Sequence, residues 1–273
     1  MKRIALLFLL CFDLAAFGQD FFAAGIVTTR DGTPLSYVNI GIRGSRIGTI
    51  SGPDGTFRLG VPDTVMNDSL TFSSVGYEVV RVPVRDFNRK KITVTLNEKV
   101  FTLPEVTVSV GKSKTRKLGI TGRTPFVTTP AISYRQDDIF EQGRLIRLKE
   151  PAKVLDANIF LEGASTDSVR IRLNIYAAEN GLPGSRIVEK SIVRNFAGRK
   201  GWLAFDLRAE DIYLDGDFVV SFEYLPAWEQ KSDRRVHFGA KLGTGDSFVR
   251  RNSLGSWERI KGGGSVIYVT VRS

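Results

Sequence analysis

The stretch GTISGPDGTFRLGV, residues 48–61, decides the fold of the first part of the chain. The Pro-Asp-Gly at its centre predicts a tight turn, because glycine tolerates a positive φ and an aspartate side chain can bond to its own backbone. Beyond this turn, Phe57, Leu59 and Val61 alternate with polar or small residues and therefore point to one face of a strand. A tight turn that leads into a half-buried strand is typical of an antiparallel sheet.

Further short strands surround this one at a regular spacing. Asp31-Gly32 is a second tight turn, and neither turn has the alternating carboxylates of an EF-hand, so we interpret both as plain turns. The expected strands cover residues 25–29, 37–42, 56–61, 70–75, 79–84 and 92–96. This density of strands, without helical periodicity, predicts a β-sandwich of about seven strands.

Several motifs follow one another in a characteristic order between residues 21 and 97. They are Gly25-x-Val27, Asp31-Gly32-x-Pro34-Leu35, Val38-Asn39-Ile40, Gly48-Thr49-x-Ser51, Asp54-Gly55-x-Phe57-x-Leu59 and Leu70-x-Phe72-x-Ser74-Val75-Gly76-Tyr77. Their order resembles the carboxypeptidase-like regulatory domain, a transthyretin-like β-sandwich common in secreted and outer-membrane proteins of Gram-negative bacteria. The resemblance implies a domain at residues 19–97 that serves as an assembly or stabilising module.

Cysteine and histidine are nearly absent from the 273 residues, which have one of each, Cys11 and His237. Zinc clusters, disulfides, Cys/His nucleophilic pairs and the two-histidine metal site of a zinc carboxypeptidase therefore lack residues that they need. A serine triad would have to use His237, and no GxSxG motif is present to position its nucleophile. We expect a protein that is not an enzyme and that has no cofactor.

Residues 1–18 have the features of a secretory signal peptide: a basic start, an apolar run at residues 4–12 and small residues at the end. Asp13 ends this run well short of the roughly 20 residues of a membrane span. A lipoprotein site at Cys11 would need small residues before the cysteine, and leucines stand there. We expect an exported protein, in the periplasm, at the outer membrane or outside the cell, without a transmembrane segment after cleavage.

Residues 98–127 change in character and are expected to form a basic linker. Five basic residues and no acid lie between residues 111 and 123. The preceding stretch, residues 103–114, resembles the segment that follows the same domain in TonB-dependent outer-membrane receptors, but too few residues remain for the barrel of such a receptor. The linker could end in an added edge strand, and its charge could contact phosphate-bearing lipid or polysaccharide.

The last part, residues 128–273, is again dense in strands and predicts a second all-β domain, a jelly-roll-like sandwich. Alternating apolar and polar residues mark strands at residues 144–148, 154–161, 169–177, 187–193, 202–207, 218–225, 236–242 and 266–271. Residues 170–225 resemble accessory jelly-roll domains of secreted bacterial proteins, some of them similar to carbohydrate-binding modules. This resemblance identifies no ligand-binding residue.

Aromatic residues are the first candidates for ligand contact in this domain. Trp228, Trp257 and Tyr224 lie near expected loops and could stack on the apolar faces of sugar rings, while Trp202 is expected in the core. Basic residues nearby could form a patch for an acidic glycan or lipid; they are Arg234, Arg235, Arg250, Arg251, Arg259 and Lys261. Nucleic acid is not an expected partner, because export removes the chain from it and no recognition motif is present.

Acidic residues give two further candidates. Asp211, Asp215 and Asp217 could bind calcium, although a polar turn before the next strand is the simpler interpretation. Carboxylate pairs could act in a glycosidase, with Glu223 and Glu229 or Asp137 and Asp138 as candidates.

The function expected from the sequence is that of a non-enzymatic cell-envelope protein which binds or assembles with a glycan or a protein partner. The alternative is a carboxylate-dependent hydrolase in the C-terminal domain, which requires two acidic side chains that face one another across an open cleft.

Overall fold

The computed structural model describes residues 21–87, 90–100, 114–135, 137–226 and 235–273. Strands dominate these residues and confirm the all-β prediction, and the helical elements among them are two short 3-10 turns, η1 (Asp63–Val65) and η2 (Val84–Phe87). No helix in this part of the chain is long and apolar enough to cross a membrane. The expected signal peptide lies outside the described residues.

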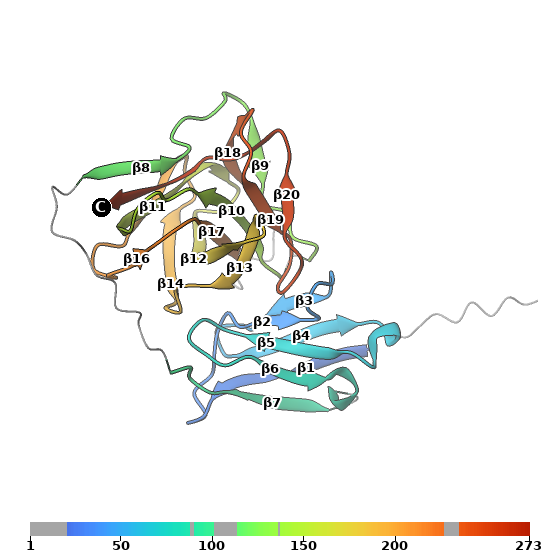
Figure 1. Cartoon of the computed structure of the whole chain (residues 1–273). Helices are drawn as coiled ribbons and strands as arrows, with labels where there is room; N and C mark the ends of the chain where they lie inside the picture. The colour runs from blue at the N-terminus through green and yellow to red at the C-terminus, as the bar shows by residue number, and fades with distance from the viewer. Residues whose placement is uncertain (1–20, 88–89, 101–113, 136, 227–234) are drawn as a thin grey trace, which may run out of the picture.

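The N-terminal domain is a sandwich of two sheets with seven strands in all, as predicted (Figure 1). One sheet has the order β4 (Thr56–Val61), β1 (Phe21–Thr29), β7 (Lys91–Leu96), and the other has the order β3 (Gly48–Ile50), β2 (Asn39–Gly41), β5 (Ser69–Ser73), β6 (Val80–Pro83). The pairs are antiparallel except β1 with β7, which run parallel. This parallel pair is a difference from the antiparallel sandwich expected.

The core of this domain follows from the alternation in the sequence. Phe57, Leu59 and Val61 are buried on β4, whereas Thr56 and Arg58, which alternate with them, are exposed. The ring of Phe57 meets the ring of Phe72 edge to face, with 5.4 Å between their centroids. The apolar side chains of both sheets thus form one continuous core.

The C-terminal domain consists of two larger sheets. The seven-stranded sheet has the order β13 (Leu182–Arg186), β12 (Ser168–Glu179), β17 (Phe218–Leu225), β10 (Phe140–Ile146), β19 (Ser247–Arg250), β20 (Glu258–Ile260), with β14 (Ile192–Ala197) also paired to β12. The eight-stranded sheet has the order β21 (Gly263–Ser265), β18 (Val236–Leu242), β11 (Ala152–Ala164), β22 (Ile267–Arg272), β8 (Thr115–Gly119), joined by β15 (Gly201–Asp206), β16 (Tyr213–Leu214) and β9 (Thr128–Pro130).

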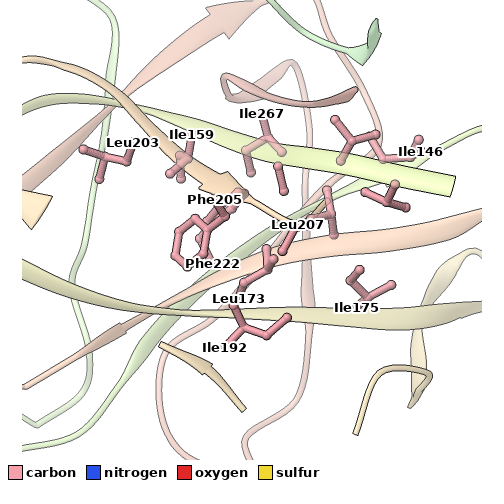
Figure 2. Packing of buried hydrophobic residues seen from close by; sticks show 14 of the residues in the cluster. Ile146, Ile159, Leu173, Ile175, Ile192, Leu203, Phe205, Leu207, Phe222 and Ile267 are labelled. Atoms are coloured by element: carbon pink, nitrogen blue, oxygen red, sulfur yellow. The ribbon is translucent and has the colours of Figure 1, made fainter. Parts of the chain in front are cut away.

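The inner faces of these two sheets enclose the main hydrophobic core (Figure 2). Ile159 and Ile267 come from the eight-stranded sheet, and Leu173 and Phe222 come from the seven-stranded sheet. The rings of Phe205 and Phe222 join the two sheets, with 5.7 Å between their centroids. This packing agrees with the two-sheet sandwich predicted for the C-terminal part.

The second domain begins earlier than residue 128. Strand β8, at Thr115–Gly119, lies inside the expected linker and pairs with β22. It is the added edge strand in which, from the sequence, the linker could end. The strand expected at residues 187–193 is shifted to β14 at Ile192–Ala197, and β19, β20 and β21 were not predicted. These strands are short or have glycines and charged residues that hide the alternation.

Candidate ligand site between the two domains

The outer face of the seven-stranded sheet is buried at its central strands β10 and β17, although it carries polar residues there. All residues of β17 are buried, whereas buried and exposed residues would alternate along a strand whose sheet had one solvent-exposed face. The N-terminal domain lies over this face, with β2 and β3 toward the second domain (Figure 1). The interface between the domains therefore combines polar side chains, which must satisfy one another, with a small apolar cluster of Ile50, Ile139 and Leu225.

Arg172 and Glu223 form the centre of this interface. They stand opposite one another on β12 and β17, and two hydrogen bonds of 2.7 and 2.8 Å join the guanidinium to the carboxylate. Arg172 also donates a 2.9 Å hydrogen bond from Nη1 to the carbonyl oxygen of Tyr37 in the N-terminal domain. Burial would raise the pKa of Glu223, but the charge and hydrogen bonds of Arg172 lower it to about 2. The pair remains ionised at neutral pH.

A second buried carboxylate, Glu141 on β10, extends the network toward the edge of the interface. Arg250 pairs with its Oε2, while Tyr176 donates to its Oε1 over 3.0 Å and Ser221 over 2.5 Å. Burial would lower the pKa of Arg250, but the negative charge of Glu141 raises it. Asn174 donates to both Glu141 and Glu223 and so joins the two ion pairs.

Ser253, which is held by Asp138 of the same domain, makes a third contact between the domains through Asn39. The backbone N–H of Ser253 donates to the Asp138 carboxylate, and its Oγ lies 2.6 Å from Asp138 Oδ1 and 3.0 Å from the Asn39 Oδ1 of β2. Asp138 has no ion-pair partner among the described residues, and burial raises its pKa to about 7. Ser253 begins the segment that carries Trp257.

A cleft of about 840 Å³ opens at one side of this interface and is lined by both domains. Arg43 and Tyr77 line it from the N-terminal domain, and Tyr176, Arg186 and Trp257 line it from the C-terminal domain. The Lys99–Glu189 ion pair, at 2.6 Å, connects the two domains at the cleft. Its volume is in the range of small-molecule and oligosaccharide sites, and its lining is largely polar.

Aromatic rings and guanidinium groups alternate in the C-terminal wall of the cleft. The rings of Tyr176 and Trp257 meet edge to face at 5.7 Å. The guanidinium of Arg250 lies 4.9 Å from the Trp257 ring, and that of Arg186 lies 5.5 Å from the Tyr176 ring. Such a wall offers a half-buried indole for an apolar face and several hydrogen-bond donors for hydroxyl or acidic groups.

The structure separates the three aromatic residues predicted to contact a ligand. Trp257 lines the cleft, but Tyr224 is buried in the main core and cannot belong to an open site. Trp228 lies outside the described residues, as does Glu229. The core position of Tyr224 follows from its place on β17, where it shares the inner face with Phe222.

Three residues of the predicted basic patch belong to separate ion pairs. Arg250 is buried against Glu141, Arg251 pairs with Glu258 at 3.5 Å, and Arg259 lies 3.8 Å from Asp246. Arg234 lies outside the described residues. The patch is therefore not a free basic surface as a whole, and Arg250 instead forms part of the cleft.

The three aspartates predicted to bind calcium do not form one site in the structure. Asp211 pairs with Lys153, Asp217 accepts a 3.0 Å hydrogen bond from the backbone N–H of Leu148, and Asp215 precedes Gly216 in the turn before β17. In the described part of the chain, no three His, Cys, Asp or Glu residues are grouped to hold a metal. Calcium binding thus remains a prediction from the sequence alone.

The hydrolase candidates do not face a cleft as a pair. Glu223 is fully buried against Arg172, and Asp138 is buried against Ser253, whereas Asp137 pairs with Arg135 on the surface. His237 lies on β18 with its Nδ1 3.5 Å from Thr128 Oγ1. None of these arrangements supplies two facing carboxylates.

Trp202 was expected in the core but lies on the outer face of the eight-stranded sheet, where 38% of its surface is exposed. Its neighbours Leu203 and Phe205 take the inner face instead. Its ring contacts those of Phe160 and Tyr268, with 5.2 and 4.8 Å between centroids. The error arose because an apolar run such as WLAFDL does not itself show which alternate set faces inward.

Sequence comparison assigns the N-terminal part to a family. Residues 23–108 match the family model of the CarboxypepD_reg-like domain, so this part of the chain is a domain of that family, as the motif resemblance predicted. The chain is 30% identical over 110 residues to a TonB-dependent receptor, P39, of Formosa agariphila, and 31% identical over 110 residues to the TonB-dependent receptor SusC of Bacteroides thetaiotaomicron. Each alignment covers 40% of this chain and 10% of the relative, so the chain spans about a tenth of the length of these receptors.

Solved structures resemble the chain only distantly. The cysteine protease and lectin-like domains of Cwp84, a surface layer associated protein of Clostridium difficile, align with 92% of this chain and 58% of that chain. The identity is 9% and the TM-score is 0.39. This likeness is too weak to support an inference about the site.

Proposed function

We propose that this chain is an exported, non-enzymatic cell-envelope protein that binds a glycan in the cleft between its two domains. The observation that carries the proposal is the cleft itself, where Trp257 and Tyr176 lie beside the guanidinium groups of Arg186 and Arg250. Aromatic faces with nearby hydrogen-bond donors are suited to sugar rings, which present C–H faces and hydroxyl edges.

The family assignment supports a place in the cell envelope. The N-terminal domain has its match in the CarboxypepD_reg-like family, and its curated relatives are TonB-dependent receptors of Gram-negative bacteria. In this proposal the N-terminal domain serves as a structural module: it covers the polar face of the seven-stranded sheet and supplies one wall of the cleft. The C-terminal domain supplies the aromatic wall.

The state of the carboxylates favours binding over hydrolysis. A glycosidase needs one carboxylic acid that donates a proton and a second carboxylate beside the substrate. Arg172 lowers the pKa of Glu223 to about 2 and encloses it, so Glu223 is poorly suited to donate a proton to a ligand. Burial raises the pKa of Asp138 to about 7, but Asp138 is buried against Ser253 and does not line the cleft. The proposal therefore includes no chemical step.

Replacing Trp257 with alanine is expected to weaken glycan binding more than about 10-fold, because a central aromatic contact is the kind of residue that dominates a binding site. Binding is measured on a glycan array and then by titration calorimetry with each glycan that binds on the array. The matched control is Trp202→Ala, which removes the exposed tryptophan of the opposite sheet.

The control is expected to bind as the unaltered protein does. If Trp202→Ala abolishes binding and Trp257→Ala does not, the site lies on the eight-stranded sheet and the cleft assignment is wrong. If the unaltered protein binds no glycan on the array but retains a protein from envelope extract, the glycan proposal is wrong and the domain pair binds a protein.

A further inference from the structure

We infer that the ligand of the cleft carries a carboxylate, as in the uronic acid units of an acidic glycan, and that this carboxylate pairs with Arg186. This inference rests on the proposed function and narrows it to a class of ligand. The arrangement that carries it is a half-buried guanidinium that faces the cleft without an acidic partner.

Arg186 stands on β13, at the edge of the seven-stranded sheet. Its one hydrogen bond among the described residues runs from Nη2 to the hydroxyl of Tyr176 over 3.5 Å, and the same guanidinium lies over the Tyr176 ring. Its Nε is buried and has no hydrogen-bond partner there. A guanidinium has five donors, and the remaining Nη donors of Arg186 are left for a ligand or for solvent.

Two other cations of the cleft are already neutralised by acids of the chain. Arg250 is paired with Glu141, and Lys99 is paired with Glu189. Their charges hold the interface together, which leaves Arg186 as the cation of the C-terminal wall that lacks a carboxylate within the described structure. Ion pairing in a partly desolvated site contributes more than on the open surface.

Tyr176 holds the guanidinium of Arg186 in place. Its hydroxyl donates to Glu141 and can therefore accept from the Arg186 and Arg250 groups. Tyr176 itself is buried and its ring packs against Trp257. An arginine fixed in this way presents a planar fork that matches a carboxylate in bidentate geometry.

The N-terminal wall adds a second guanidinium that has no acidic partner in the described part of the chain. Arg43, on the segment between β2 and β3, is exposed and lines the same cleft. The acids that line the cleft are Glu78 and Glu189, of which Glu189 is paired with Lys99. Among the described residues, two guanidinium groups without an acidic partner, Arg43 and Arg186, therefore stand against one carboxylate without a basic partner, Glu78, which favours an anionic ligand over a cationic one.

The remaining lining favours a sugar over a peptide as the source of the carboxylate. Hydroxyl side chains are numerous in the cleft: Ser73, Ser74, Ser185 and Ser256. The apolar aliphatic side chains are few, namely Val79, Pro183 and Leu254, whereas a protein or peptide interface usually has a more apolar core. A ligand with many hydroxyl groups and one carboxylate per ring matches this lining.

The test uses the chain from residue 19 onward. Its binding is measured to a panel of uronic acid oligosaccharides, which are galacturonate, glucuronate and mannuronate oligomers. Each is paired with its carboxyl-reduced counterpart, which keeps the sugar backbone and loses the charge. We expect at least one acidic oligomer to bind and its reduced counterpart to bind about 10- to 100-fold more weakly.

Arg186→Gln is expected to remove this preference, so that the acidic and reduced oligomers bind to similar extents. Arg186→Lys keeps the charge but loses the fork, and we expect an intermediate affinity. The matched control is Arg194→Gln, because Arg194 is exposed on β14 and does not line the cleft. Thermal unfolding of each variant verifies that the fold is kept.

The outcomes distinguish this inference from the proposed function. If the reduced oligomers bind as tightly as the acidic ones, or if Arg186→Gln keeps the preference, the carboxylate inference is wrong while glycan binding in the cleft stands. If an acidic peptide library binds in an Arg186-dependent way and no oligosaccharide does, both the inference and the glycan proposal are wrong.

Discussion

Replacing Arg172 with methionine is expected to destabilise the protein by about 3–5 kcal/mol, because it leaves the charge of Glu223 buried without its partner. The methionine fills much of the same volume, so the loss reports the unpaired carboxylate more than a cavity. The same change removes the hydrogen bond to Tyr37 and so weakens the contact between the domains. The free energy of unfolding is measured by urea denaturation at neutral pH.

The control for this prediction is Arg208→Met. Arg208 also pairs with a carboxylate, that of Asp206, but both groups are exposed. Surface pairs of this kind contribute about 0–1 kcal/mol. Equal losses for the two variants would contradict a buried charged interface between the domains, and so would an Arg172 variant that is as stable as the unaltered chain.

Asp138 is expected to make the protein less stable as the pH rises from about 4 to about 7. The folded pKa of Asp138 is about 7 and its ordinary value is 3.8, so the folded state holds this proton through a range in which the unfolded chain releases it. Its contribution to stability is therefore complete below the ordinary pKa and is lost as the pH passes the folded pKa. The total loss is about 4 kcal/mol, at about 1.4 kcal/mol for each pKa unit.

Asp138→Asn separates this effect from that of other carboxylates. The amide keeps an oxygen that can accept from the Ser253 backbone N–H but has no proton to lose in this range. The free energy of unfolding of both proteins is measured by urea denaturation between pH 4.5 and 8. As the pH rises, the unaltered protein is expected to lose stability relative to the asparagine variant. A difference that does not vary with pH would show that Asp138 titrates normally.

The fold could be predicted largely from the sequence because its signals are local. Asp54-Gly55 marks the turn before β4, and Phe57, Leu59 and Val61 mark the inner face of that strand. The edge strand β8 was harder to identify, since Thr115–Gly119 is a basic segment whose strand character comes from pairing with β22, far along the chain.

The site could not be predicted because it depends on which sheet face is covered. In the sequence SVRIRLNIYA, Arg172, Asn174 and Tyr176 alternate with apolar residues and read as a solvent-facing set. The covering domain converts that set into a buried network. Polar residues at every second position of β12, with Glu223 opposite Arg172 on the neighbouring strand, are the one signal that could have indicated it.

The central claim is that a glycan binds between the two domains, and hydrogen–deuterium exchange tests it most directly. The chain is compared with and without the oligosaccharide that binds most tightly on the array. The account predicts slower exchange in both domains at once, at residues 39–44 and 73–79 of the first and at residues 183–189 and 250–257 of the second. Slower exchange confined to the outer face of the eight-stranded sheet around Trp202, or to one domain alone, would contradict it.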